Sequence, residues 1–360
     1  MRTLYRSKQG WVLLLAACSG AAAERPREST GAARFAAAGA AVMADSASLC
    51  WQRFRRGEPV EASCTSLAVT ARVDTVQDTV RVVVPVPVST FVPFAFGPSD
   101  MYRGPDAHRG FTAGLTYADP QGLVKLLAKL RANQQRAFLA LTGGKHEQYI
   151  TDKKFDLDKW KGGVARYATT ELRAALEAGV ADGTILGYSM MDEPPHPSWG
   201  GVLTKATVDT MAAYCKSLFP FLPCGVAVDH AWRPTERYRL VDFIIAQTWM
   251  ESISSTAFRD SAVAAARRNG LALVLSMNLF GARPTPGCEP RRNQCLMRPE
   301  EVREWGRAFM SEPYACAVVI WHYEAPMWAR AEYQAQFQDL SSVARQRVAK
   351  PCTRPSLLGR

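Results

Sequence analysis

The sequence lacks the motifs and runs that would assign it to several common protein classes. No apolar run reaches the ~18 residues that a helix needs to cross a bilayer. Cys-x-x-Cys pairs, Gly-x-Gly-x-x-Gly turns, P-loops and Gly-x-Ser-x-Gly elbows are absent, and the five histidines are scattered. We therefore expect no metal site, no nucleotide or other cofactor, and no serine-hydrolase chemistry.

The charge balance is basic, but the basic residues form no stripe. The formal net charge is +11 at pH 7, and the excess is spread over short pairs such as Arg55-Arg56 and Arg267-Arg268. Such pairs are typical of solvated surfaces, and without interleaved aromatic residues they do not indicate a nucleic-acid groove. We expect a monomer with no nucleic-acid partner. Attraction to an acidic polysaccharide or an anionic membrane is the alternative.

The start of the chain has the features of an export signal. Three basic residues among the first eight precede a short apolar run, and this run ends in Leu15-Ala16-Ala17-Cys18. These four residues resemble the cleavage box of bacterial lipoproteins, in which the cysteine becomes the lipidated first residue. The resemblance implies a signal peptide over residues 1–18 and a lipid anchor on Cys18, facing the periplasm or the cell exterior. A plain secretory signal is the alternative.

The cysteine count also indicates export. Removing Cys18 from the nine cysteines leaves an even set of eight, which suits disulfide bonds in an oxidising compartment. Proximity along the chain favours the pairs Cys50–Cys64, Cys215–Cys224 and Cys288–Cys295, which leaves Cys316–Cys352. Buried free thiols are the alternative.

Composition divides the chain into four parts. Residues 19–45 are rich in Ala, Gly, Ser, Arg and Glu, which predicts a flexible tether. Residues 46–90 form an extension that contains two cysteines and an extended segment at 79–88. The prolines of this segment place it at a sheet edge or outside the main sheet. Residues 91–350 have a different, alternating pattern.

Within 91–350, short apolar strands alternate with amphipathic helices, which predicts a parallel sheet. This length suits an α/β fold of the closed (β/α)8 TIM barrel type, with a doubly wound sheet as the alternative. Seven strands can be counted, and the eighth is either the 79–88 segment or a short piece that the pattern does not reveal. We predict strands at 91–96, 137–142, 185–191, 224–229, 243–247, 272–278 and 316–322. We predict helices at 120–134, 160–180, 204–218, 257–269, 299–311 and 330–347.

Two of the predicted strands end in acidic residues. The apolar run 185–191 is followed by Asp192, Glu193 and Pro194, and the proline must stop the strand because it cannot donate to a ladder. The strand that begins at Cys316 leads to Glu324. Because the carboxyl ends of barrel strands carry the chemistry, two acids at two strand ends suggest cleavage of a glycosidic bond.

Polar and aromatic residues follow the other predicted strands as well. Aromatic faces stack on sugar rings, while carboxylates and amides bond sugar hydroxyls, so this mixture suits a carbohydrate partner. A structural role in the core is the alternative for each tryptophan. The candidate substrate-binding residues are Asp100, Asp192, Asp229, Trp249, Asn278, Trp321, His322 and Tyr323.

The segment from Gly187-Tyr188 to Asp192-Glu193-Pro194 resembles the corresponding segment of the clan A TIM-barrel glycoside hydrolases. The resemblance implies that Glu193 is the general acid/base and Glu324 the nucleophile or second carboxylate. In those families the two glutamates lie on strands four and seven, with two strands between them. Three predicted strands separate the two residues here, which puts a retaining mechanism in doubt. A non-catalytic carbohydrate-binding surface lipoprotein remains the alternative function.

Overall fold

A computed structural model describes residues 44–55, 58–69, 93–102, 110–143, 147–201, 203–228, 237–248, 253–282, 290–291, 294–321 and 325–355. The chain forms two compact units, Met1–Val88 and Ser89–Arg360. The predicted signal with Cys18, nearly all of the tether and the 79–88 segment lie outside the described residues. No helix in the described part is both long and apolar enough to cross a membrane.

The described part of the N-terminal unit is an antiparallel hairpin. Strand β1 (Ala44–Arg55) pairs with β2 (Glu58–Val69). The register places Cys50 directly opposite Cys64. This register brings together the two cysteines that the sequence predicts as a pair.

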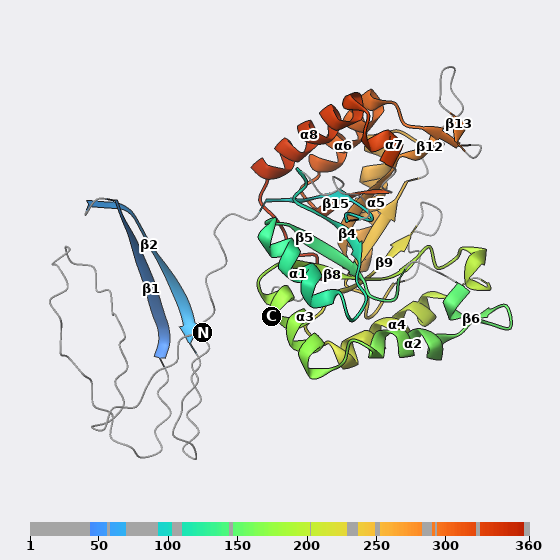
Figure 1. Ribbon diagram of the computed structural model, residues 1–360, viewed down its shortest axis with the longest axis horizontal. Coiled ribbons are helices and arrows are strands. Elements are labelled where there is room, and N and C mark those ends of the chain that lie inside the picture. Colours follow the sequence, from blue (N-terminus) through green and yellow to red (C-terminus); the bar gives the residue numbers. More distant parts are fainter. Residues whose placement is uncertain are drawn as a thin grey trace, which may run out of the picture. The chain divides into compact units, whose positions relative to one another are not determined.

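The C-terminal unit is a parallel barrel surrounded by helices (Figure 1). Its eight strands hydrogen bond in the order β3-β15-β11-β10-β9-β8-β5-β4, and a parallel bridge between Ser99 and Leu115 joins the two end strands. The backbone N–H of Met101 adds a bond to the Leu115 carbonyl at 3.2 Å. The (β/α)8 barrel is thus confirmed, and the doubly wound sheet is excluded. The strands are β3 (Ala95–Pro98), β4 (Ala113–Tyr117), β5 (Arg136–Ala140), β8 (Ile185–Asp192), β9 (Cys224–Val228), β10 (Phe243–Gln247), β11 (Ala272–Asn278) and β15 (Ala315–Trp321).

Helices cover the outside of the barrel, and small elements decorate its loops. The helices are α1 (Leu123–Ala132), α2 (Leu157–Ala165), α3 (Thr170–Ala181), α4 (Lys205–Leu218), α5 (Ser255–Asn269), α6 (Pro299–Met310), α7 (Ala325–Trp328) and α8 (Ala331–Gln346), with 3-10 turns η1 (Glu147–Tyr149) and η2 (Pro197–Trp199). The small strands are β6 (Ile150–Thr151), β7 (Lys154–Phe155), β12 (Phe280–Ala282), β13 (Pro290–Arg291) and β14 (Gln294–Leu296).

The eighth strand is β4, a short piece that the hydrophobic pattern did not reveal. Its sequence, Ala-Gly-Leu-Thr-Tyr, offers one large aliphatic residue instead of an apolar run. A Cβ atom on Gly114 would lie 2.5 Å from the Pro98 carbonyl oxygen, and a Cβ on Gly97 would overlap the Ala113 carbonyl. Both glycines therefore allow β3 and β4 to approach and close the barrel. The same requirement weakens the strand signal in the sequence.

The predicted helix at 160–180 is wrong in its continuity, because two helices occupy this region. Helix α2 ends at Ala165, and α3 starts at Thr170 after Thr169, whose Oγ1 accepts a hydrogen bond from the Leu172 N–H at 3.3 Å. This side chain caps α3 in the usual way for threonine. Between the helices, the Tyr167 hydroxyl donates to the Leu141 carbonyl at 2.8 Å and fixes the break against the barrel.

The core has two layers, one inside the barrel and one between strands and helices. The inner cluster draws residues from all eight strands and none from the helices, and Phe138 and Phe243 pack in it with ring centroids 5.1 Å apart. On most strands its members alternate with residues that face the helices, as the pleat of a β-strand requires, while β15 contributes the consecutive Cys316 and Ala317 at a register shift. The larger outer cluster includes Leu127, Trp160 and Phe258, which are almost fully buried.

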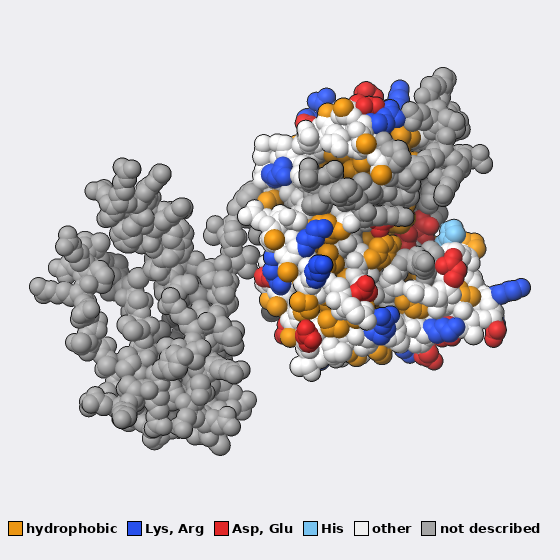
Figure 2. All heavy atoms as spheres, in the orientation of Figure 1, with side chains coloured by type: hydrophobic (Ala, Val, Ile, Leu, Met, Phe, Trp, Pro, Cys, Tyr) orange, Lys and Arg blue, Asp and Glu red, His pale blue; other side chains and the backbone are white. Residues whose placement is uncertain are grey.

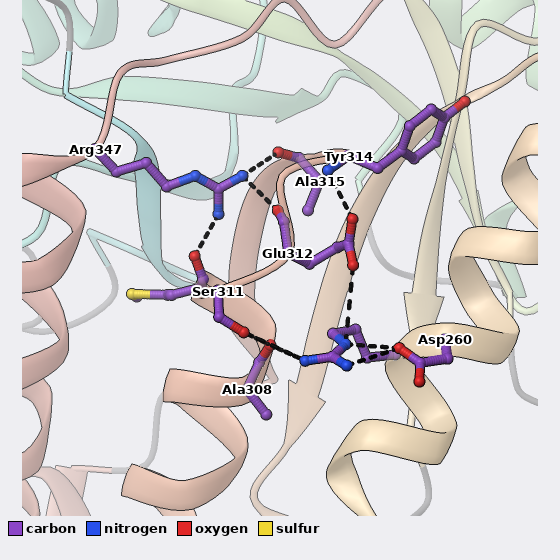
Figure 3. A network of polar contacts seen from close by, with 9 residues as sticks. Asp260, Ala308, Ser311, Glu312, Tyr314, Ala315 and Arg347 are labelled. Atoms are coloured by element: carbon purple, nitrogen blue, oxygen red, sulfur yellow. Dashed lines mark hydrogen bonds and ion pairs between the residues drawn. The ribbon is translucent and has the colours of Figure 1, made fainter.

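A polar network holds the amino end of β15 (Figure 3). The Arg347 guanidinium donates to the carbonyls of Met310, Glu312 and Ala315 at 2.5–2.9 Å, and it stacks 3.8 Å from the Phe94 ring centroid. These bonds satisfy carbonyl groups in the turn that connects helix α6 to β15. The network therefore holds the chain after α8 against the end of the barrel at which the strands begin.

Two of the predicted disulfide bonds are confirmed. Cys215 on α4 bonds Cys224 at the start of β9, and Cys316 on β15 bonds Cys352 in the C-terminal segment. Cys352 is buried in the inner cluster, so the second bond pins the C-terminal segment to the barrel interior. Cys288 lies outside the described residues.

The two disulfides should contribute unequally to stability. The Cys316–Cys352 bond closes a separation of 36 residues and the Cys215–Cys224 bond one of 9. Each disulfide bond lowers the entropy of the unfolded chain, and more so when the loop it closes is longer. Replacing both cysteines of the Cys316–Cys352 pair by serine should therefore lower the free energy of unfolding by about 4 kcal/mol, and the same replacement at Cys215–Cys224 by about 2.5 kcal/mol. Urea unfolding of both variants measures the difference. An equal or larger loss at Cys215–Cys224 would contradict the expectation.

Candidate active site

The site begins where strand β8 leaves the barrel. Residues 185–191 are buried, and the register with β9 shifts between Ser189 and Asp192. Glu193 follows with φ of +44°, in the left-handed region that side chains rarely adopt, and its N–H donates to the Ala227 carbonyl at 3.0 Å. Such a conformation costs on the order of 1 kcal/mol and is found most often at functional sites. The chain turns sharply here, and Glu193 leaves the direction of the strand.

Asp192 is held by two side-chain contacts, one from a distant strand and one from the turn that follows it. The Gln247 side-chain amide, at the end of β10, donates to Oδ1 of Asp192. The indole N–H of Trp199 donates to the Asp192 backbone carbonyl at 2.8 Å. Trp199 is buried and meets Phe155 edge-on with ring centroids 5.7 Å apart. The carboxyl and the backbone of Asp192 are therefore both fixed.

The environment of Asp192 favours its protonated form. Burial, and then the neighbouring charge of Glu193, raise the pKa of the Asp192 carboxyl from 3.8 to about 7, although the Gln247 hydrogen bond lowers it. Removing a carboxylate from water disfavours its charge, and a second carboxylate adds repulsion. A carboxyl with this pKa exchanges a proton near neutral pH, which general acid–base chemistry requires.

The alternation of residues along the strands places the ends of three other strands at the level of Asp192. Tyr117, Gln247 and Trp321 end strands β4, β10 and β15, each two residues beyond a member of the inner cluster (Leu115, Ile245 and Val319). With β8, these are the second, fourth, sixth and eighth barrel strands, and such barrels stack side chains in layers of four from alternate strands. Below this layer lie the apolar residues of the inner cluster. Tyr117, Asp192, Gln247 and Trp321 thus form the uppermost described layer, which we call the mouth layer.

The mouth layer is exposed on its aromatic side and buried on its amide side. The side chain of Tyr117 is 42% exposed, whereas that of Gln247 is 4% exposed. Trp321 is half-buried. A partly exposed aromatic residue beside a hydrogen-bonding pair forms a surface that suits an amphipathic ligand.

Strand β11, the seventh of the barrel, ends without an acid. Ser276 and Asn278 are its buried polar residues near the carboxyl end. Oδ1 of Asn278 accepts a hydrogen bond from the Phe280 N–H at 3.0 Å, so the amide shapes the turn into β12. The clan A resemblance implies a carboxylate at the end of this strand, and β11 contains none.

Behind β8, a hydrogen-bonded cluster connects the strand to the helix layer. The Tyr188 hydroxyl lies 3.0 Å from Oγ1 of Thr142, and the Tyr149 hydroxyl donates to the Thr142 carbonyl at 2.5 Å. Trp160 stacks on the Tyr188 ring with centroids 6.5 Å apart. Burial raises the pKa of Tyr188 well above its usual value, so the hydroxyl stays protonated. Tyr188 therefore supports the strand from the helix side and does not face the mouth layer.

The described residues bring together part of the predicted site. Asp192, Glu193, Asn278 and Trp321 gather at one end of the barrel, and Asp100 follows β3 at the same end with φ of +58°. The remaining predicted site residues lie outside the described part of the chain: Asp229, Trp249, His322, Tyr323 and Glu324. Within the described residues, no cluster of His, Cys, Asp and Glu could hold a metal ion.

The sequence prediction did not select Tyr117 or Gln247. Tyr117 was missed because its strand, β4, was missed. Gln247 ends a strand that was predicted at 243–247, but an isolated glutamine carries no pattern that links it to Asp192, 55 residues away. The shared signal is position, since both are the last residue of a barrel strand.

The surface charge is mixed on the face shown in Figure 2, where Lys and Arg are interspersed with acidic side chains. Among the described residues, some bases pair with acids, as in Arg131–Asp182 at 2.7 Å and Arg307–Asp339 at 2.8 Å. Arg267 and Arg268 are exposed, which agrees with the interpretation of the short basic pairs as solvated surface. Exposed pairs of this kind contribute little to stability.

No protein-family model matches this chain, and no curated protein matches it. Solved structures with a similar fold include a GH113 β-1,4-mannanase, at 8% identity and a TM-score of 0.47 over 71% of this chain and 99% of that chain. A GH5_18 protein from Bifidobacterium longum subsp. infantis has 12% identity and a TM-score of 0.47 over 73% and 81%. Xylanase 10B from Thermotoga maritima has 9% identity and a TM-score of 0.43 over 71% and 97%. Similarity at this level concerns the architecture and assigns no reaction.

The raised pKa of Asp192 should make stability depend on pH in a defined direction. The folded state binds the proton more tightly than the unfolded state, so this stabilisation is present below pH 4 and is lost as the pH rises toward 7. We expect Asp192→Asn to gain unfolding free energy relative to the wild type across this window, by up to about 4 kcal/mol. Urea unfolding between pH 4 and 8 measures the gain. Asp158→Asn, an exposed site on α2, is the matched control, and a flat difference for Asp192→Asn would contradict the assignment.

Proposed function

We propose that this chain is a glycoside hydrolase that cleaves O-glycosidic bonds of a carbohydrate outside the cytoplasm, with Glu193 as general acid/base. The observation that carries the proposal is the place of Asp192-Glu193-Pro194 in the barrel. With β4 included, β8 is the fourth strand of the barrel. This is the strand on which the resembled clan A families have their acid/base glutamate.

The second carboxylate is proposed to come from a different strand than in those families. Strand β11, the seventh, contains no acidic residue. Glu324 follows β15, the eighth strand, and three strands (β9, β10 and β11) separate β15 from β8. Such a separation favours the wider spacing of ~6.5–9.5 Å that leaves room for a water molecule in an inverting mechanism. We therefore propose Glu324 as the base that activates this water.

The mouth layer supports a sugar as the ligand. The exposed ring of Tyr117 and the half-buried ring of Trp321 offer apolar faces on which a pyranose can stack. Asp192 and Gln247 offer hydrogen-bonding groups for its hydroxyls. We assign secondary contacts to Asn278, Asp100, Asp229, Trp249, His322 and Tyr323.

We propose export with a lipid anchor on Cys18. The two disulfide bonds of the barrel support an oxidising compartment, because such bonds persist outside the cytosol. The barrel would then act on carbohydrate in the periplasm or at the cell exterior, tethered through residues 19–45.

A carbohydrate-binding protein without catalytic activity is the second candidate function. The observation that favours it is the end of β11, where Asn278 is engaged in a turn and no carboxylate is present. A barrel that keeps aromatic and amide groups but lacks one of two acids retains affinity for sugars and loses hydrolysis.

Hydrolysis by the soluble fragment from about residue 46 tests the proposal. The panel contains β-linked glucans, mannans and xylans, α-linked glucans and acidic polysaccharides, and reducing ends are counted. We expect the wild type to cleave at least one of them and Glu193→Gln to lose 100-fold or more of that rate, the usual order for a general acid. Glu171→Gln, on α3, controls for the substitution. Binding without cleavage by the wild type would favour the second candidate.

The stacking role of Tyr117 predicts a graded loss of affinity. Because the ring face makes the contact, Tyr117→Phe should bind the selected oligosaccharide nearly as well as the wild type, while Tyr117→Ala should bind about 10-fold more weakly. Isothermal titration with the Glu193→Gln background avoids turnover during the measurement. Equal affinity of all three proteins would exclude Tyr117 from the sugar contact.

A further inference from the structure

The hydrogen bond between Gln247 and Asp192 distinguishes the two oxygens of the carboxyl. Nε2 of Gln247 can only donate, so Oδ1 of Asp192 accepts. The carbonyl oxygen of a carboxylic acid is a better acceptor than its hydroxyl oxygen, so this bond favours a proton on Oδ2. Gln247 is buried at the end of β10 and bonds Oδ1, while Asp192 itself is only partly buried.

A second contact fixes the residue that carries this carboxyl. The Trp199 indole bonds the Asp192 backbone carbonyl at 2.8 Å, and the next residue, Glu193, adopts the left-handed turn. Together these contacts hold the Cα–Cβ bond of Asp192 toward the mouth layer while the Glu193 backbone turns away. Such fixed geometry is what a preorganised donor requires.

We propose that Asp192 enters ligand binding as a neutral carboxylic acid, which donates the Oδ2 hydrogen to a substrate oxygen, and that Gln247 is the positioning residue that orients it. This inference rests on the proposed function for the identity of the ligand as a sugar. The state of Asp192 itself does not depend on that function. A carboxylic acid at this place adds a donor among sugar-binding groups, whereas a carboxylate could only accept.

The charges around Asp192 agree with the neutral form. Burial is the larger cause of the raised pKa of Asp192, and on its own segment the adjacent Glu193 carboxyl raises this pKa further when Glu193 is ionised. The other residues of the mouth layer are Tyr117, Gln247, which bonds Asp192, and Trp321, and none of these residue types carries a charge near neutral pH. His196, in the following turn, points Nδ1 at the Ser198 N–H at 3.2 Å. Asp229, His230 and Glu324 follow neighbouring strands and lie outside the described residues.

The titration of Asp192 in the free protein tests the inference without any substrate. Carbon-13 NMR of the aspartate carboxyls, assigned by the signal that Asp192→Asn removes, reports its midpoint. We expect a midpoint near pH 7. We expect a higher midpoint in Gln247→Met, which keeps the length of the side chain and removes the donor. Gln148→Met is the matched control, because the Gln148 amide bonds the Thr142 carbonyl and not Asp192.

The outcomes separate this inference from the proposed hydrolysis. A midpoint near 4, the ordinary value for aspartate, would overturn the neutral donor whether or not the protein cleaves a glycan. An unchanged midpoint in Gln247→Met would overturn the positioning role. A midpoint near 7 in a protein that cleaves nothing in the panel supports the inference and rejects the hydrolase.

Binding of the oligosaccharide selected from the panel gives a second test. In the wild type, affinity should fall as the pH rises through about 7, because ionisation removes the donor. In Asp192→Asn, the Nδ2 amide replaces the hydroxyl and cannot ionise, so this pH dependence should disappear. At pH 6, Asp192→Asn should bind at least 10-fold more tightly than Asp192→Ala. Equal binding by the two variants would contradict donation from this position.

Discussion

Closure of the barrel between β3 and β4 is the constraint on which the site depends. Gly97 and Gly114 remove the side chains that would separate these strands, and the Ser99–Leu115 bridge completes the ring. Without closure, β3 and β4 would be the opposite edges of an open sheet, with β15 next to β3. Tyr117 and Trp321 would then be far apart instead of flanking β3 at one mouth. A steric property of two glycines thus decides which side chains can act on the same ligand.

The sequence predicted the elements that depend on local patterns and missed those that depend on distant contacts. Apolar runs identified seven strands, and Pro194 marked the end of β8 correctly, because burial and a missing N–H act within a few residues. Strand β4 escaped because barrel closure requires a glycine where a strand pattern needs an apolar residue. The Asp192–Gln247 bond escaped because its partners meet only after β8, β9 and β10 have assembled.

Counting β4 changes the chemical interpretation of the barrel. Glu193 moves to the fourth strand, where the resemblance has its acid/base, while the seventh strand remains without an acid. Of the two glutamate positions in the clan A resemblance, the one on the fourth strand is therefore matched and the one on the seventh strand is not. The structure has instead a buried aspartate beside Glu193, fixed by an amide from β10. Two neighbouring carboxyls in a poorly solvated place titrate as a pair, so their roles should be assigned together.

The contacts that tie the strands together and the candidate site lie at opposite ends of this barrel. The Cys316–Cys352 bond and the Arg347 network fix the amino ends of the strands through covalent and charge-assisted contacts. The carboxyl ends carry unfavourable features, namely the left-handed Glu193 and Asp100 and the buried carboxyl of Asp192. Each of these lowers stability and persists only if the surrounding fold enforces it. The contacts that fix the amino ends of the strands are therefore the physical condition that lets the carboxyl ends hold the Asp192 carboxyl in its protonated form near neutral pH.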